Sequence, residues 1–305
     1  MSKVIGRYAP SPTGDLHLGN LRTALLAWLQ VRLQNGEFLL RMDDLDKPRV
    51  VNGSADKILR DLEWLGLDWD GDVIYQSKRT DLYQDALEQL TQRALTYECF
   101  CSRKDIQQAV SAPHGSLGIY TGTCSDLNDE LIELKRQHKA PAIRCRIRSK
   151  LIKFEDGCLG EFSRNLAHSC GDFVIKRADG LFAYQLATAI DDMQQGITEV
   201  LRGADLLEST ARQLYIMRCL DSNIELPVYW HVPLMLDDQG ERMAKRDGSL
   251  SITEWQANDR SASELIGFLA ASIGLIDVED SVSARDLLAE LTIEKWRQQI
   301  RSYKH

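Results

Sequence analysis

Three residues near the N-terminus, His17, Gly19 and Asn20, stand where a strand is expected to end and a helix to begin. The strand is expected over Lys3–Ala9, and the helix follows from apolar residues at helical spacing. The N–H groups and the dipole of a helix N-terminus favour phosphate. A glycine there lets a flat ring lie against the backbone, while the two polar side chains can donate hydrogen bonds to phosphate or ribose oxygens. The pattern predicts a nucleotide site. For the four residues H-L-G-N taken alone, a capped helix start with a chance histidine is an equally good explanation.

Three of the seven cysteines have a spacing typical of metal ligands, namely Cys99, Cys101 and Cys124. Two thiolates one residue apart suit a tetrahedral metal better than a disulfide with each other, and a fourth ligand would complete a zinc site. From spacing alone, His114 is a reasonable fourth ligand, and three buried free thiols are the alternative. The other cysteines have no ligand spacing and are interpreted as core or chance residues: Cys145, Cys158, Cys170 and Cys219.

The composition describes a chain of 305 residues with 44% apolar residues, 27% charged residues and a net charge of −8. This predicts a sizeable core, and the acidic balance argues mildly against non-specific nucleic-acid binding without excluding a local basic groove. The N-terminus has no apolar signal-peptide region, and no apolar run is long enough to span a bilayer. Cysteines without a secretion signal indicate a reducing compartment. We expect a cytoplasmic protein with no membrane partner.

The order of expected elements indicates an α/β fold. After the first strand and helix come a buried strand that runs into an acidic loop, together covering 37–46, and two amphipathic helices, Asp56–Leu65 and Thr80–Leu95. This alternation predicts a parallel sheet with crossover helices. The alternation stops near residue 98 and resumes near residue 171. We therefore expect an α/β domain formed by 1–97 and 171–250, an insertion over 98–170 and a helical tail over 251–305.

The stretch "PSPTGDLHLGN" resembles the His-Ile-Gly-His signature of class I aminoacyl-tRNA synthetases, in the form used by the glutamyl branch, with Asn20 replacing the second histidine. The stretch "RMAKRDGS", Arg242–Ser249, resembles the Lys-Met-Ser-Lys-Ser loop of the same family. Lys245 falls on its second lysine and Arg242 on its first, whereas both serines are replaced. "YQLATAIDD" and "ITEVLRGADLLESTARQ" also match the branch, so the resemblance runs from residue 3 to about residue 250.

The resemblance implies a Rossmann-like parallel sheet and a site for ATP, Mg²⁺ and L-glutamate. The catalytic residues it implies are His17, Asn20 and Lys245, and Gly19 and Arg242 join them in ATP binding. A mobile cation at Lys245 can stabilise the charge on departing pyrophosphate. The glutamate-binding residues it implies are Arg7, Tyr8, Ala9, Pro10, Ser11, Asp43, Tyr184 and Arg202.

Glutamate brings two carboxylates and one ammonium, so its pocket needs guanidinium groups and an acid. Arg7 and Arg202 are the candidate guanidinium groups, although surface salt bridges would also explain two arginines. Asp43 would meet the ammonium, in a position where the family usually has the longer glutamate. For the metal, the resemblance selects Tyr120 as the fourth ligand beside the three cysteines, in a closed and therefore structural zinc site.

Residues 249–305 are too few for the anticodon-binding domain of a glutamyl-tRNA synthetase, because a separate domain usually takes on the order of 100 residues or more. The chain therefore resembles the shortened glutamyl-queuosine branch of the family. That branch activates glutamate with ATP and attaches it to the queuosine base in the anticodon of tRNA(Asp). The alternatives are a truncated glutamyl-tRNA synthetase that charges a tRNA 3′ end, a catalytically silent RNA-binding or zinc-binding paralogue, and another nucleotidyl transferase on the same architecture. The basic face formed by Arg144, Arg146 and Arg148 is a candidate surface for the anticodon loop.

Overall fold

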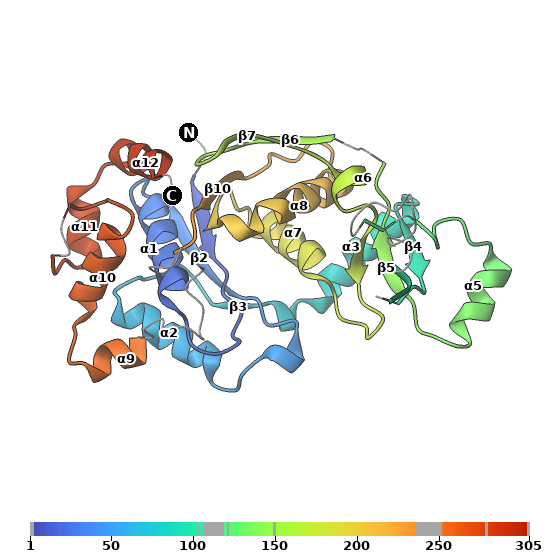
Figure 1. Ribbon diagram of the computed structural model, residues 1–305, viewed down its shortest axis with the longest axis horizontal. Helices are drawn as coiled ribbons and strands as arrows, with labels where there is room; N and C mark the ends of the chain where they lie inside the picture. The colour runs from blue at the N-terminus through green and yellow to red at the C-terminus, as the bar shows by residue number, and fades with distance from the viewer. Residues whose placement is uncertain are drawn as a thin grey trace.

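A computed structural model describes residues 3–102, 104–106, 119–120, 122–148, 151–235, 252–277 and 280–303 (Figure 1). The second synthetase-like motif, with Arg242 and Lys245, and the candidate ligand His114 lie outside these residues. Among the described helices, none is both long enough and apolar enough to cross a membrane.

The centre of the molecule is a seven-stranded sheet in the order β3-β2-β1-β9-β10-β6-β7. Its strands pair in parallel, except for the antiparallel hairpin of the last two. The strands are β1 (Ile5–Tyr8), β2 (Glu37–Met42), β3 (Ile74–Tyr75), β9 (Glu199–Gly203), β10 (Val228–Val232), β6 (Leu151–Asp156) and β7 (Gly160–Asn165). The expected parallel sheet is therefore confirmed.

Helices cover both faces of this sheet and enclose two hydrophobic cores (Figure 1). Successive residues of a strand point to opposite faces, so in β10 Trp230 joins one core and Tyr229 the other. The first face carries α1 (Leu18–Arg32), α2 (Ser54–Trp64), α9 (Ile252–Ala257), α10 (Ala262–Ala271), α11 (Ala284–Glu290) and α12 (Ile293–Ser302). The second face carries α3 (Thr80–Gln92), α7 (Tyr184–Gln194) and α8 (Leu207–Leu220). The described connections include the short 3₁₀ helices η1 (Lys47–Arg49), η2 (Gln76–Lys78) and η3 (Ala204–Leu206).

A second, three-stranded sheet lies at the far end of the molecule (Figure 1). It consists of β4 (Thr96–Cys99), β5 (Ala142–Cys145) and β8 (Phe173–Lys176), and α5 (Asp129–Arg136) and the short α6 (Leu166–Ser169) lie nearby along the chain. Strand pairing crosses the expected domain limits, because β6 and β7 from within 98–170 extend the central sheet, whereas β8 from beyond 170 joins the small one. The division at 97/98, 170/171 and 250/251 stays a prediction.

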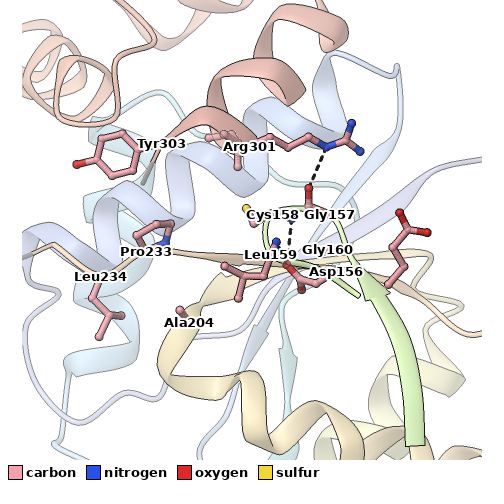
Figure 2. A pocket seen from close by; sticks show the side chains of 12 residues that line it. Asp156, Gly157, Cys158, Leu159, Gly160, Ala204, Pro233, Leu234, Arg301 and Tyr303 are labelled. Atoms are coloured by element: carbon pink, nitrogen blue, oxygen red, sulfur yellow. Dashed lines mark hydrogen bonds between the residues drawn. The ribbon is translucent and has the colours of Figure 1, made fainter. Parts of the chain in front are cut away.

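The hairpin turn between β6 and β7 packs tightly against β10 and the C-terminal helix. A Cβ atom on Gly157 would lie 2.2 Å from the ring of Trp230, so only glycine fits this approach. Arg301 Nε of α12 donates a hydrogen bond of 3.0 Å to the carbonyl of Gly157 (Figure 2). The turn and α12 line a cavity of about 840 Å³.

The arginines of the expected basic face make contacts within the chain. Arg144 stacks over the ring of Tyr120 at 3.6 Å and donates to the carbonyl of Asp172. Arg146 stacks over the ring of Tyr97, and Arg148 donates to the carbonyl of Ala94. These guanidinium groups are engaged in contacts within the chain, and their role in RNA binding stays a prediction.

Candidate active site

The carboxyl ends of the central strands open into a cavity of about 860 Å³. Ligands of open α/β sheets bind at this edge. The loop from Ala9 to Leu16 leaves β1 here and leads into α1. The structure brings together in this one lining every described residue implied for ATP or glutamate: Arg7, Tyr8, Ala9, Pro10, Ser11, His17, Gly19, Asn20, Asp43, Tyr184 and Arg202.

His17 and Asn20 cap the first helix in a reciprocal arrangement. Nδ1 of His17 accepts from the backbone N–H of Asn20, and Oδ1 of Asn20 accepts from the backbone N–H of His17, both at 3.4 Å. An accepting Nδ1 places the proton of a neutral imidazole on Nε2. The capping box uses acceptor atoms only, so it is compatible with the donor roles expected of both side chains. It also fixes their orientation at the helix N-terminus.

Gly19 leaves room for the ring of His17. A Cβ atom on Gly19 would lie 3.1 Å from Cε1 and 3.2 Å from Nδ1 of that ring. The sequence predicted that this glycine makes space for a flat ligand ring. In the structure, part of the space above the glycine is taken by the histidine ring itself, so the glycine also sets where His17 can lie.

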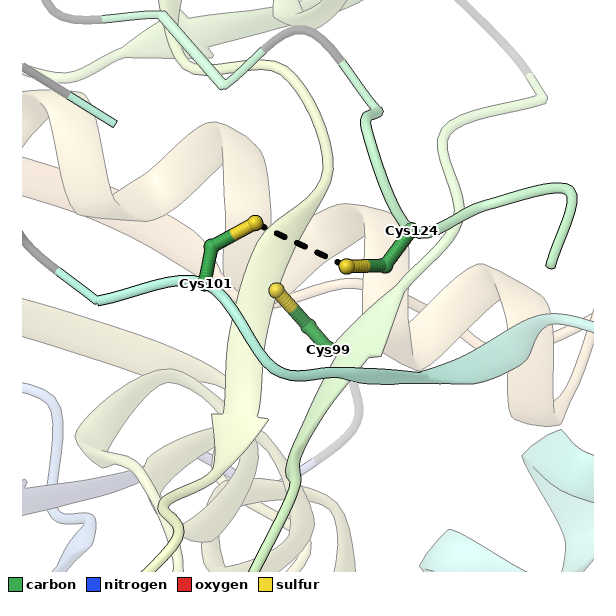
Figure 3. A group of neighbouring side chains, drawn as sticks. All are labelled: Cys99, Cys101 and Cys124. Carbon is green, nitrogen blue, oxygen red and sulfur yellow. Dashed lines mark hydrogen bonds between the residues drawn. The ribbon is translucent and has the colours of Figure 1, made fainter. Parts of the chain in front are cut away.

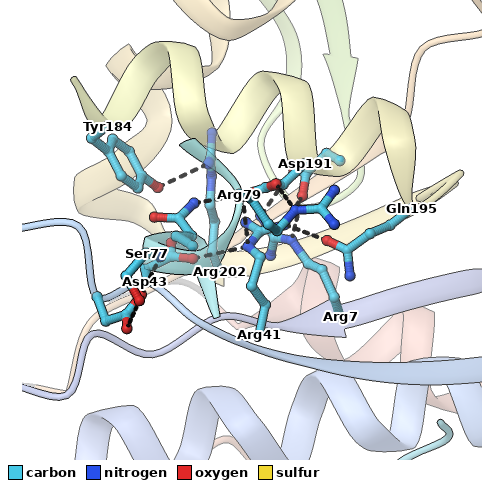
Figure 4. Close-up of polar contacts among 12 residues, drawn as sticks. Arg7, Arg41, Asp43, Ser77, Arg79, Tyr184, Asp191, Gln195 and Arg202 are labelled. Atoms are coloured by element: carbon cyan, nitrogen blue, oxygen red, sulfur yellow. Dashed lines mark hydrogen bonds and ion pairs between the residues drawn. The ribbon is translucent and has the colours of Figure 1, made fainter. Parts of the chain in front are cut away.

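A buried cluster of charges supports the floor of the cavity (Figure 4). Its centre is Arg41 of β2, whose side chain is 0% exposed. Arg41 Nε lies 2.9 Å from Asp43 and 3.7 Å from Asp191, and its Nη1 lies 2.7 Å from Asp192. Asp191 also accepts hydrogen bonds from neighbouring side chains: Gln76, Arg79 and Tyr83. Buried charges of both signs are thus paired, as a low-dielectric interior requires.

Arg7 is held by Asp192 through two hydrogen bonds. Nε and Nη2 of Arg7 lie 3.2 and 3.3 Å from the two carboxylate oxygens. Burial opposes ionisation of Asp192, but Arg7 and Arg41 outweigh burial and lower the pKa of Asp192. The carboxylate therefore stays charged and grips one edge of the Arg7 guanidinium, while Arg7 also lines the cavity.

Asp43 is the acidic residue of the cavity next to Arg41, and 6% of its side chain is exposed. Burial raises the pKa of Asp43 to about 6, although Arg41 and Arg7 oppose this rise. Because Arg41 also pairs with Asp191 and Asp192, its positive charge balances the negative charge of Asp43 only in part. A ligand ammonium in the cavity would complete its pairing.

Arg202 of β9 points into the same cavity and is 4% exposed. Its Nη2 donates to Thr210 Oγ1 at 2.8 Å, and its Nε donates to His231 Nε2 at 3.1 Å. Its Nη1 lies 3.5 Å from the hydroxyl of Tyr184, the first residue of α7 (Figure 4). The guanidinium is therefore oriented on three sides by neutral groups.

The three predicted metal-binding cysteines form a compact cluster at the end of β4, beside the second sheet (Figure 3). Their Sγ atoms lie within 4.8 Å of one another, and those of Cys101 and Cys124 are 3.5 Å apart. Four sulfurs around zinc stand about 3.8 Å apart when each Zn–S bond is about 2.3 Å. The hydroxyl of Tyr120 lies 3.3 Å from Cys99 Sγ and 3.8 Å from Cys101 Sγ, as expected of a fourth ligand.

The ionisation of Cys99 also suits a metal ligand. Burial raises the pKa of the Cys99 thiol, but hydrogen bonds from Tyr120 and Arg144 outweigh burial and lower it. Burial and the neighbouring Cys124 instead raise the pKa of Cys101 to about 12. It is the close approach of the three sulfur atoms that fits zinc.

Comparison with known proteins matches residues 3–288 to the family model of class I tRNA synthetases for E and Q, catalytic domain. A glutamyl-Q tRNA(Asp) synthetase of Nocardia farcinica is 47% identical over 271 residues, which are 88% of this chain and 85% of that protein. One from Geobacter sulfurreducens is 48% identical over 251 residues, 82% of this chain and 77% of that protein. The chain belongs to the glutamyl-Q tRNA(Asp) synthetase family.

Solved structures of glutamate-tRNA synthetases share the fold of this family member. The enzyme from Elizabethkingia anophelis superposes with a TM-score of 0.84 at 27% identity, over 96% of this chain and 66% of that one. The glutamate tRNA ligase from Elizabethkingia meningosepticum, in complex with its amino acid, gives a TM-score of 0.82 at 28% identity and the same coverage. The chain thus spans about two thirds of the length of these synthetases.

The sequence did not predict the buried cluster of this glutamyl-Q tRNA(Asp) synthetase family member. Arg41 lies within the strand EFLLRM, and Asp191 and Asp192 are consecutive residues of the helix YQLATAIDDMQ. Charged residues are almost never fully buried unless they are paired, so their presence within these elements could have indicated buried ion pairs. Their partners could not be identified, because Arg41 and Asp192 are separated by 151 positions.

Proposed function

We propose that this chain activates L-glutamate with ATP and Mg²⁺ to glutamyl-adenylate and transfers the glutamyl group to the queuosine base in the anticodon of tRNA(Asp). The chain is a ligase on this proposal. The transfer reaction rests on the names of relatives that are 43–48% identical over most of the chain.

The observation that carries the proposal is a single cavity whose lining includes the guanidinium groups of Arg7 and Arg202, the carboxylate of Asp43 and the N-terminus of α1. Arg7 and Arg202 would bind the carboxylates of glutamate, and Asp43 would bind its ammonium. The start of α1, with His17 and Asn20, would bind the phosphates or the ribose of ATP. This combination suits an acidic amino acid next to a nucleotide.

In the first step, an oxygen of the glutamate α-carboxylate would attack the α-phosphorus of ATP in line. The new P–O bond forms as the bond to the bridging oxygen breaks, and pyrophosphate leaves. The helix N-terminus and the donors of His17 would stabilise the negative charge that develops. Mg²⁺ bound to ATP would neutralise phosphate charge. Lys245 is proposed, from the sequence, to assist the departure of pyrophosphate together with Arg242.

In the second step, a hydroxyl of the queuosine cyclopentenediol would attack the acyl carbon of the adenylate. The ester bond forms, and AMP leaves with the electron pair of the cleaved acyl–oxygen bond. The proton of the attacking hydroxyl passes to the phosphate of the departing AMP, directly or through water. Neither step requires a side-chain nucleophile, so positioning and electrostatics would carry the catalysis.

We further propose that Cys99, Cys101, Tyr120 and Cys124 hold a structural zinc ion. The ion would tie β4 to the segment around residues 120–124, and it would take no part in the reaction. A cytoplasmic location for the protein stays a prediction from the sequence.

Glutamate-dependent exchange between ATP and pyrophosphate tests the activation step. The assay is run without tRNA, with glutamate, glutamine and aspartate in parallel. We expect exchange with glutamate and little with the other two, because glutamine lacks the second carboxylate and aspartate is one methylene shorter. Equal exchange with all three, or none with glutamate, would contradict the assignment of the cavity.

A further inference from the structure

The guanidinium of Arg202 is positioned by a chain of side chains that reaches the hairpin turn between β6 and β7. Arg202 and His231 are paired neighbours on the parallel strands β9 and β10. Both side chains lie on the same face of the sheet, where the ring of His231 stacks on that of Tyr229 with an interplanar angle of 4°. His231 is 0% exposed, so it cannot contact bulk water.

The neighbours of His231 select one tautomer. Its Nδ1 lies 2.6 Å from Asp156 Oδ2, and a carboxylate only accepts, so Nδ1 carries a proton. Its Nε2 faces the Nε–H of Arg202 at 3.1 Å, and a guanidinium only donates, so Nε2 is the acceptor. Thr210 Oγ1 accepts from Arg202 and lies 3.0 Å from Nε2, to which it can donate its own proton. Only neutral imidazole with its proton on Nδ1 satisfies all three neighbours.

The surroundings keep this imidazole neutral. Burial lowers the pKa of His231, and the positive charge of Arg202 adds to this effect, against the opposing influence of Asp156.

Asp156 is itself fixed by the turn. Its Oδ1 accepts from the backbone N–H groups of Cys158 and Leu159, each at 3.0 Å. The backbone beside it cannot move away easily, because Gly157 abuts Trp230 and its carbonyl accepts from Arg301 (Figure 2). The turn thus holds Asp156, Asp156 holds His231, and His231 holds Arg202.

Arg7 and Arg202, the two arginines proposed to bind glutamate, are held in different ways. Arg7 is held by the carboxylate of Asp192, which neutralises much of its charge. Arg202 is held by uncharged partners, and the carboxylate of Asp156 is one residue further away. A neutral acceptor fixes the direction of a guanidinium without consuming its charge, which remains available to a ligand carboxylate.

We propose that His231 and Asp156 are positioning residues for glutamate binding, which act by orienting Arg202 while leaving its positive charge to the substrate carboxylate. This inference rests on the proposed glutamate activation. It assigns a function to residues that the sequence did not single out.

Two substitutions of His231 separate the functions of its nitrogens. In His231→Asn, the amide nitrogen can replace Nδ1 toward Asp156, but no acceptor reaches Arg202. In His231→Gln, the amide oxygen can replace Nε2 toward Arg202. In glutamate-dependent exchange, we expect the Asn variant to raise the KM for glutamate by roughly tenfold or more, with the KM for ATP nearly unchanged. We expect the Gln variant to stay within about threefold of the wild type.

Asp156→Asn tests the tautomer. The amide at position 156 would donate to Nδ1 of His231 and thereby move the ring proton to Nε2. The Nε2–H of His231 and the Nε–H of Arg202 would then be two donors that face each other. We expect a rise in the glutamate KM similar to that of His231→Asn, and little further effect of Asp156→Asn when His231 is already glutamine. Thermal unfolding of each variant shows whether the fold is retained.

Nitrogen chemical shifts of the His231 ring in the wild-type protein give a test that requires no variant. We expect the neutral form with its proton on Nδ1 at pH 7, and a protonated or Nε2–H ring would overturn the inference. Equal glutamate KM values in the wild type, the Asn variant and the Gln variant would also overturn it, as would an equal rise in both variants. Absence of glutamate-dependent exchange in the wild type would instead overturn the proposed function.

Discussion

Arg7 and Asp192 face each other in the interior with two hydrogen bonds of 3.2 and 3.3 Å. One residue comes from the first strand and the other from α7, and the contact joins these elements directly below the cavity. Because Arg7 is also expected to bind glutamate, this pair couples the stability of the fold to the geometry of the site.

Replacing Asp192 by asparagine should destabilise the protein strongly. The change removes the carboxylate that pairs with Arg7 and one of the three carboxylates near Arg41, and loss of one partner of a buried ion pair costs about 3–5 kcal/mol. The free energy of unfolding in urea measures the loss. The matched control is Asp85→Asn, because Asp85 is exposed on α3, and there we expect a change within about 0.5 kcal/mol. Equal stability of both variants would contradict a structural role of the pair.

Glutamate binding should weaken in acid because of Asp43. This carboxyl has a pKa of about 6, so it takes up a proton as the pH falls through 6 and loses its attraction for the substrate ammonium. We expect the KM for glutamate to rise by about tenfold from pH 7.5 to pH 5, since about one tenth of the groups remain ionised there. Exchange assays across this range measure it. Asp43→Asn should raise the KM at pH 7.5 and flatten its pH dependence, and an equally steep profile in this variant would exclude Asp43 as the cause.

Replacing Gly19 by alanine should separate stability from nucleotide binding. Alanine favours a helix by about 1 kcal/mol over glycine, so the helix should not be weakened. The new methyl group would press on the ring of His17 at 3.1–3.2 Å and shift it. We expect the KM for ATP to rise by roughly tenfold, because small displacements at a reacting centre are costly. An unchanged ATP KM would show that the position of His17 is not critical.

Replacing Lys245 by alanine should reduce adenylate formation by roughly tenfold or more and leave the fold intact, because the cation is proposed to stabilise departing pyrophosphate. ATP–pyrophosphate exchange and thermal unfolding provide the two readouts. Lys135→Ala, at an exposed position on α5, is the control and should exchange normally. Normal exchange by the Lys245 variant would remove this residue from the mechanism.

The cysteine cluster should bind about one zinc ion per chain, which metal analysis after gentle purification measures. Chelation should lower the melting temperature, because a bound structural metal contributes to folding free energy. Cys101→Ser should lower the zinc content, whereas Cys158→Ser, outside the cluster, should not. A protein purified without zinc and insensitive to chelation would contradict the proposed site.

The parts of the fold that the sequence predicts well are those that depend on local patterns. The first strand, the loop and α1 follow one another within about 30 residues, and the periodicity of apolar side chains identifies them. The cap of α1 is equally local, because His17 and Asn20 are three positions apart. The cysteine spacing also predicted a cluster that the structure brings together.

The parts that the sequence does not predict depend on distant partners. Nothing in the local pattern pairs β6 with β10 or Asp156 with His231, which are 75 positions apart. The same holds for the partners of Arg41. A charged side chain can be buried only where an oppositely charged side chain lies beside it. When the topology of the sheet brings such partners together from distant positions, the sequence contains no periodic pattern that identifies the pair.

The central claim is that the glutamyl group is transferred to queuosine. The most direct measurement uses labelled glutamate, ATP and Mg²⁺ with three RNAs in parallel: tRNA(Asp) with queuosine, the same tRNA without queuosine, and tRNA(Glu). We predict label on queuosine-containing tRNA(Asp) alone. Label on the 3′ end of tRNA(Glu), or equal label on tRNA(Asp) with and without queuosine, would contradict the claim.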